Sequence, residues 1–297
     1  MAVSSVPPPL TRPELPEGAP EPRGGAAVEE LPPWRPWTAP AAIVLGLALG
    51  SLGDIVVSIV GAASGASVSH PPPMVNIVGD VFFDLGFVAA AIYIASLSGG
   101  LRLADFGFRR AALRRAVWIV ALAALCYYVA TDVYAQLLGL HGREQLPTGL
   151  GSTKDTADMI AVGVFVTVIA PICEELFFRG FLFGVLRSWL ACRPWGTWVA
   201  AIVTGILFGA AHTGSAAVKY LIPLAFLGFI LCIVRWQTGS LYPGMALHSI
   251  NNSLAFGIDE LHWDVAKIIA MALVALTAIA AISGRLGARE PAVAAGG

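Results

Sequence analysis

Charged residues are scarce in this 297-residue sequence: Asp, Glu, Lys and Arg make up 12% of it, about half of their share in soluble domains. Hydrophobic residues make up 57%, and the mean hydropathy is +0.76. This balance excludes an ordinary soluble domain and indicates a polytopic membrane protein. The formal net charge is −1, so the total charge gives no sign of nucleic-acid binding, and we expect no nucleic-acid partner.

The sequence also lacks paired cysteines and a secretory leader. Its cysteines show neither a CxxC metal pair nor an extracellular disulfide pattern, and we interpret them as small buried hydrophobic residues. They are Cys126, Cys173, Cys192 and Cys232. The N-terminus is proline-rich and acidic, without the basic segment and apolar core of a signal peptide.

Composition divides the chain into three parts. Residues 1–36 are rich in Pro, Gly, Ala and Glu and are expected to form a disordered tail, as are residues 286–297. Residues 37–285 are expected to form a single bundle. Trp34 and Trp37 are expected to mark a membrane interface at its start.

Apolar windows of about 20 residues, the length that crosses a bilayer as a helix, recur through the bundle. We therefore expect an all-α, polytopic transmembrane helix bundle of about eight helices. Their expected ranges are 38–62, 74–98, 114–138, 158–188, 196–213, 218–236, 240–258 and 264–284. The basic residues of the connecting segments predict a multi-pass protein of the cell membrane with both termini in the cytoplasm.

Three charged side chains lie inside the fourth apolar segment. A charge at the bilayer centre costs about 2.5–3.5 kcal/mol on insertion scales, so such residues pair with one another or serve a function. Glu175 and Arg179 are four residues apart with the acid first, the favourable order for an ion pair on one helix face. Glu174 lies about 100° from Glu175 around the helix. We assign Glu175 and Arg179 to a neutralising pair and Glu174 to chemistry.

Two later spans carry further polar motifs. Phe208 and His212 lie at the end of the fifth span. His248 and Asn252, four residues apart and so on one helix face, lie in the seventh. Together with Glu174 they predict a polar chamber with a base, two imidazoles and an amide that can stabilise an oxyanion. No convincing nucleophile accompanies them, so a water activated by Glu174 is the economical agent, and the set suits amide hydrolysis.

These motifs, Glu-Glu-x-x-x-Arg, Phe-x-x-x-His and His-x-x-x-Asn, occur in that order within residues 158–257. The region resembles the CPBP family of CAAX-type prenyl-protein endopeptidases and bacteriocin-processing or self-immunity proteins, also called the abortive-infection domain. The resemblance implies an intramembrane endopeptidase acting on a membrane-associated protein or peptide, with or without a lipid anchor. By position it assigns catalytic roles to Glu174, His212, His248 and Asn252, and supporting roles to Glu175 and Arg179. It implies that His212 helps to polarise the water and that His248 and Asn252 steady the oxyanion.

Members of this family are often described as metalloproteases. Glu174, His212 and His248 could form a zinc site with two histidines, one glutamate and a water at the fourth position. The sequence has no HExxH motif, and no residue is spare to act as base if Glu174 binds a metal. We therefore favour a water activated by glutamate with no required cofactor, and the zinc site stays the alternative.

Straight helices would place His212 about 10 Å from Glu174 along the membrane normal, at about 1.5 Å per residue. Pro171 is expected to kink the fourth span and reduce this mismatch.

A second polar stripe leaves two other classes of function open. Asn76, Asp80 and Asp84 recur every four residues on the second span, with Asp54 on the first and Asp132 on the third. Intramembrane acids can bind a cation or relay protons, which would make the protein an ion-coupled transporter, or they can hold helices together. A transporter is expected to show paired broken helices in an internal repeat, and no repeat is visible. The third class is a non-catalytic membrane scaffold or bacteriocin self-immunity factor, which would not need a buried, unpaired carboxylate.

Overall fold

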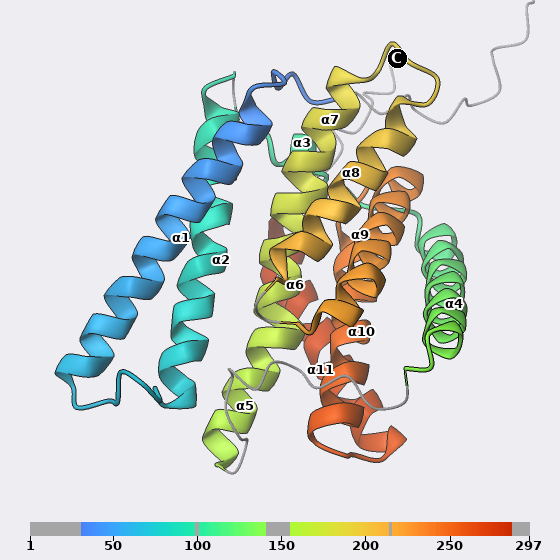
Figure 1. The fold of residues 1–297 in the computed structure, drawn as a ribbon. Helices are drawn as coiled ribbons and strands as arrows, with labels where there is room; N and C mark the ends of the chain where they lie inside the picture. Colours follow the sequence, from blue (N-terminus) through green and yellow to red (C-terminus); the bar gives the residue numbers. More distant parts are fainter. Residues whose placement is uncertain (1–30, 99–100, 141–154, 214–215, 287–297) are drawn as a thin grey trace, which may run out of the picture. The chain divides into compact units, whose positions relative to one another are not determined.

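The computed structural model describes residues 31–98, 101–140, 155–213 and 216–286, and their regular structure is helical (Figure 1). The long helices are α1 (Thr38–Ala63), α2 (Pro73–Ser96), α4 (Leu113–Leu137), α8 (Gly196–Ala211), α9 (Val218–Thr238), α10 (Tyr242–Ala255) and α11 (Val265–Ser283). Shorter elements are α3 (Leu103–Phe106), the π-helical η4 (Phe256–Glu260) and the 3₁₀-helical η5 (Gly284–Leu286). The fourth span is built from five consecutive segments, described below.

The expected all-α polytopic bundle is confirmed, since each of the eight expected ranges corresponds to a helical segment. Six helices of the described chain are long and apolar enough to cross a membrane: α1, α2, α4, the continuous segment Thr156–Trp189, α9 and α11. α8 is apolar but has only 16 residues. α10, with 14 residues, carries the His-x-x-x-Asn motif and is the most polar of the long helices. The two motif histidines thus belong to these shorter helices: His212 directly follows α8, and His248 lies within α10.

The fourth span contains two π-helical segments, which the sequence did not reveal. It consists of α5 (Thr156–Val164), η2 (Phe165–Ile169), α6 (Ala170–Glu174), η3 (Glu175–Leu182) and α7 (Phe183–Trp189), where η2 and η3 are π-helical. Pro171 lies in the first turn of α6, directly after η2. π-helical turns inside α-helices are frequent at functional sites, and here the two π segments flank Glu174.

Pro171 also explains how α10 attaches to this span. Proline has no N–H, so the preceding turn loses a hydrogen bond to a carbonyl four or five residues earlier. Those two carbonyls belong to Val166 and Thr167, and both accept hydrogen bonds from α10. Asn252 Nδ2 donates to Val166 O at 2.8 Å, and Ser249 Oγ donates to Thr167 O at 2.6 Å. Pro171 was expected to kink the span, and the structure shows in addition that the two carbonyls before it bind α10.

Glycines allow neighbouring helices to approach closely. α8 packs along α9, and an added Cβ at Gly205 would lie 2.7 Å from both Ala225 O and Phe229 N. α1 packs along α2 in the same way, where a Cβ at Gly86 would lie 2.7 Å from Gly50 Cα. Small residues at such contacts let backbones meet when lipid supplies no hydrophobic force between helices.

The N-terminal boundary and Trp34 differ from expectation. Trp34 is buried, with its ring 4.8 Å from that of Phe106 and 5.0 Å from that of Phe181. Ser188 on α7 donates to the carbonyl of Pro32 at 2.8 Å. Trp34 is therefore a core residue and not an interface marker, because three aromatic rings from distant parts of the chain cover one another. Pro32 and Trp34, within the tail expected at 1–36, pack with the bundle.

Residues 1–30 of that tail lie outside the described residues, as does the tail expected at 286–297 except for its first residue.

The interpretation of the cysteines as buried residues holds for only half of them. Cys173 and Cys232 are buried, whereas Cys126 and Cys192 are exposed.

We predict that Gly205→Val lowers the stability of the folded bundle by about 1–3 kcal/mol, because the new side chain meets backbone atoms of α9 that cannot rotate away. The matched control is Gly284→Val, since an added Cβ at Gly284 has no neighbour within 4 Å. Thermal unfolding of the purified protein in detergent measures the difference. Equal melting temperatures for the two variants would show that α8 and α9 do not need this close contact.

Candidate active site

A buried ion pair lies at the centre of the fourth span. Arg179 NH1 is 2.9 Å from Glu175 Oε1, and both side chains have no exposed surface. Arg179 also donates to the carbonyl of Gly228 at 3.3 Å. Its guanidinium lies over the ring of Phe208, 4.2 Å from the centroid, at a distance suited to a cation–π interaction. The expected pairing of Glu175 with Arg179 is confirmed, and α8 and α9 both contribute to it.

His248 connects the two glutamates. Its Nδ1 is 3.1 Å from Glu175 Oε1, and its Nε2 is 3.7 Å from Glu174 Oε2. A carboxylate only accepts hydrogen bonds, so Nδ1–H donates to Glu175 and this contact fixes the orientation of the ring. Nε2 is thereby turned towards Glu174, and the distance of 3.7 Å is too long for a direct hydrogen bond.

Glu174 is the more accessible of the two carboxylates. Its side chain is 18% exposed, whereas that of Glu175 is fully buried. Oε2 of Glu174 is itself buried and has no hydrogen-bond partner among the described residues. Oε2 of Glu175 is also buried without a hydrogen-bond partner among the described residues, but that side chain has no exposed surface. Of the two carboxylates, the partly exposed Glu174 is therefore the one that a water or a substrate atom can reach.

Phe208 joins both histidines to the buried arginine. Its ring centroid is 4.8 Å from that of His212 and 5.7 Å from that of His248. His212 Nδ1–H donates to the carbonyl of Phe208 at 2.8 Å, which leaves Nε2 as the acceptor in the neutral ring. The mismatch in depth expected for straight helices therefore does not keep His212 away from the cluster, because both imidazoles pack on one phenylalanine.

Asn252 is placed one turn after His248 on α10, as the spacing predicts. Its Nδ2 donates to Val166 O, and its Oδ1 lies 3.4 Å from Nδ2 of Asn251. The amide nitrogen carries two hydrogens, so one remains for a further acceptor. Asn252 thus holds α10 against η2, in addition to the role that the resemblance implies.

Two residues that support the site were missed. Gly244 on α10 faces Glu175, and an added Cβ would lie 2.7 Å from Glu175 Oε2. Phe208 received no chemical role, yet it is completely buried and contacts three polar side chains of the cluster. The signal for Phe208 was its place in the Phe-x-x-x-His motif. Nothing local in the sequence distinguishes Gly244 from the other glycines of the bundle.

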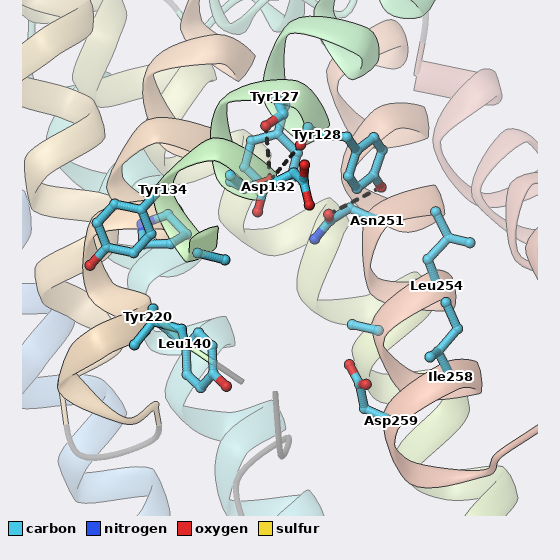
Figure 2. Close-up of a pocket in the computed structure, with 14 residues that line it drawn as sticks. Tyr127, Tyr128, Asp132, Tyr134, Leu140, Tyr220, Asn251, Leu254, Ile258 and Asp259 are labelled. Carbon is cyan, nitrogen blue, oxygen red and sulfur yellow. Dashed lines mark hydrogen bonds between the residues drawn. The ribbon is translucent and has the colours of Figure 1, made fainter. Parts of the chain in front are cut away.

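The acids of α1 and α2 form a series that leads to Glu174. Asp54 and Asp80 interact electrostatically, as do Asp80 and Asp84, and Asp84 interacts in turn with Glu174. Oδ2 of Asp84 is buried with no hydrogen-bond partner among the described residues. Asp132 does not belong to this series, because it lies on α4 beside a separate pocket (Figure 2).

The zinc alternative depends on how the possible ligands are arranged. In the described ranges, no group of three or more His, Cys, Asp and Glu side chains is arranged to hold a metal ion. Both histidines hold an oxygen at Nδ1 and keep Nε2 as the other ring nitrogen, an arrangement that metal-binding histidines share. Zinc on Glu174, His212 and His248 therefore stays the alternative, and we derive no step through a metal.

Comparison with known proteins finds that the region of this site is similar to one protein family. Residues 156–254, that is 99 of the 297 residues, match the family model described as type II CAAX prenyl endopeptidase Rce1-like. An uncharacterized 24.3 kDa protein of Escherichia coli is 31% identical over 131 residues, 44% of this chain and 58% of that protein. UPF0177 protein YxdF of Lactococcus lactis subsp. lactis (strain IL1403) is 25% identical over 146 residues, 47% of this chain and 75% of that protein.

The chain thus spans 58% of the length of the first of these relatives. No solved structure matches. The matched region begins with α5, and it contains the buried ion pair, both histidines and Asn252. Residues 156–254 therefore form an Rce1-like region, and the resemblance to the CPBP family is confirmed for the part of the chain that carries all three motifs.

Proposed function

We propose that this protein is an intramembrane endopeptidase that hydrolyses peptide bonds of membrane-associated proteins or peptides with a glutamate-activated water. The observation that supports this most directly is the buried, unpartnered Oε2 of Glu174, 3.7 Å from Nε2 of His248. A water bound to both atoms at about 2.8 Å would sit to one side of the line between them. The oxygen of this water would face the space beside the side chains of Glu174 and His248.

Glu174 acts as the general base in this proposal. It takes a proton from the water while the oxygen attacks the carbonyl carbon of the substrate, and a C–O bond forms. Nε2 of His212, the acceptor of that ring, helps to polarise the water. The protonated Glu174 then returns the proton to the amide nitrogen as the C–N bond breaks, which yields a carboxylate and an amine.

The negative charge that develops on the carbonyl oxygen needs donors. His248 is flanked by two carboxylates, and in its protonated form Nε2–H donates to this oxygen. The second hydrogen of Asn252 Nδ2 is the other donor. Glu175 and Arg179 do not touch the substrate in this scheme: they keep His248 in its orientation and neutralise each other.

We predict that Glu174→Gln lowers cleavage by about 10²–10⁴-fold, the usual contribution of a general base, while the protein still folds. His212→Ala is expected to abolish cleavage as well. The measurement is a peptidomic comparison of membranes containing wild type or variant, which reports substrate and cleavage site together. Unchanged melting temperatures serve as the control for folding.

Identical peptide profiles for wild type and Glu174→Gln would contradict the proposed function. They would favour the non-catalytic scaffold, which tolerates the loss of this carboxylate.

Arg179→Ala is expected to act on stability, with a cost of about 3–5 kcal/mol, because it leaves the charge of Glu175 buried without a cation. Adding Glu175→Gln should recover part of this loss by removing the stranded charge. Arg193→Ala, at an exposed arginine, is the control. Thermal unfolding in detergent reports all three, and wild-type stability of Arg179→Ala would show that the pair does not support the site.

The metal-free scheme predicts that cleavage survives thorough chelation. Purified protein is treated with EDTA or phenanthroline and assayed on a substrate found by the peptidomic comparison. Loss of cleavage on chelation and its return with Zn²⁺ would reverse the assignment of Glu174 from base to metal ligand.

A further inference from the structure

A cavity that is lined by neither Glu174 nor Glu175 lies between α4, α9, α10 and η4 (Figure 2). Its volume is about 380 Å³, within the range of small-ligand pockets. It is lined by Tyr127, Tyr128, Thr131, Asp132, Tyr134, Ala135, Leu140, Tyr220, Pro223, Asn251, Leu254, Ala255, Ile258 and Asp259. Four tyrosines and two carboxylates are an unusual lining for a cavity in so apolar a chain.

The lining suits a cation. None of the 14 described residues that line the cavity is basic, and two of them, Asp132 and Asp259, are acids. Gln136 donates to Asp132 Oδ2 at 2.6 Å, a neutral partner that orients the carboxylate without removing its charge. Tyrosine rings attract cations through their faces. The chain already uses one ring in this way, since the ammonium of Lys219 lies 4.8 Å from the centroid of Tyr220.

Hydrogen bonds connect this cavity with the candidate active site. Tyr128 donates its hydroxyl to Asn251 Oδ1 at 3.3 Å, and Figure 2 shows this contact beside Asp132. Asn251 Nδ2 is in turn 3.4 Å from Asn252 Oδ1. Asn251 follows His248 by three residues, which is about 4.5 Å along the helix axis. A group bound at the Asp132 end of the cavity is therefore only a few residues of extended peptide from His248.

We propose that this cavity is a substrate subsite that binds a long basic side chain of the peptide, within a few residues of the bond to be cleaved. The inference rests on the proposed function. Arginine fits better than lysine, because its planar guanidinium stacks on tyrosine rings and can bind a carboxylate through two hydrogen bonds. Asp132 is the principal partner, and Asp259 marks the opposite end of the cavity (Figure 2).

The test is binding of Nα-acetyl-arginine methylamide to the full chain in detergent at low ionic strength, followed by saturation-transfer NMR. The experiment is done with Glu174→Gln, so that its result does not depend on catalysis. The lysine analogue and the uncharged citrulline analogue, which has nearly the shape of arginine, are compared with it. We expect the arginine probe to bind at least about fivefold more tightly than the citrulline probe, with lysine between them.

A pair of variants assigns the binding to the cavity. Asp132→Asn with Asp259→Asn should weaken binding of the arginine probe about tenfold. Asp158→Asn with Glu260→Gln removes the same two charges at positions that do not line the cavity, and should leave binding unchanged.

Three results would overturn the proposal: no binding of the arginine probe, equal binding of the citrulline probe, or equal weakening by both double variants. Tighter binding of phosphoethanolamine than of the arginine probe would also overturn it, and would assign the cavity to a lipid headgroup. None of these results tests whether Glu174 is the catalytic base, because the peptidomic comparison tests that role separately.

Discussion

The organisation of the site depends on holding one guanidinium and two carboxylates inside an apolar bundle. A buried charge is tolerated only when an opposite charge and enough hydrogen bonds replace its water. Arg179 obtains the opposite charge from Glu175, a hydrogen bond from the carbonyl of Gly228 and a cation–π contact from the face of Phe208. Glu175 obtains a second donor from His248. Four spans must therefore meet at one place, and this requirement fixes how α8, α9 and α10 pack on the fourth span.

Among the residues that the structure describes, the site has one guanidinium for two carboxylates, so one carboxylate has no guanidinium as its partner. This carboxylate, Glu174, is the group available for chemistry. Arg179 pairs with the fully buried Glu175, and Oε2 of Glu174 lies 3.7 Å from an imidazole nitrogen of His248. The same arrangement that neutralises the first carboxylate aims Nε2 of His248 at the second. Glu175 is thus the carboxylate that neutralises Arg179, and the adjacent Glu174 is the carboxylate that stays available for catalysis.

The parts of this picture that the sequence predicts are those that local spacing determines. Runs of about 20 apolar residues give the spans, and a separation of four residues puts Glu175 with Arg179 and His248 with Asn252 on common faces. The missed features depend on residues far apart in the chain. Trp34 is buried because Phe106 and Phe181 come to it, and Gly244 matters because Glu175 approaches it. The π-helical turns likewise form where the fourth span meets α10.

The meeting of the fourth span with α10 shows why a single motif serves both fold and chemistry. Pro171 withholds an N–H from the turn before it, and the carbonyls of Val166 and Thr167 accept from Asn252 and Ser249. These bonds fix the height and rotation of α10, and so the position of His248 one turn earlier. A His-x-x-x-Asn spacing would be needed here even if Asn252 never met a substrate, because the asparagine sets the place from which the histidine reaches both glutamates.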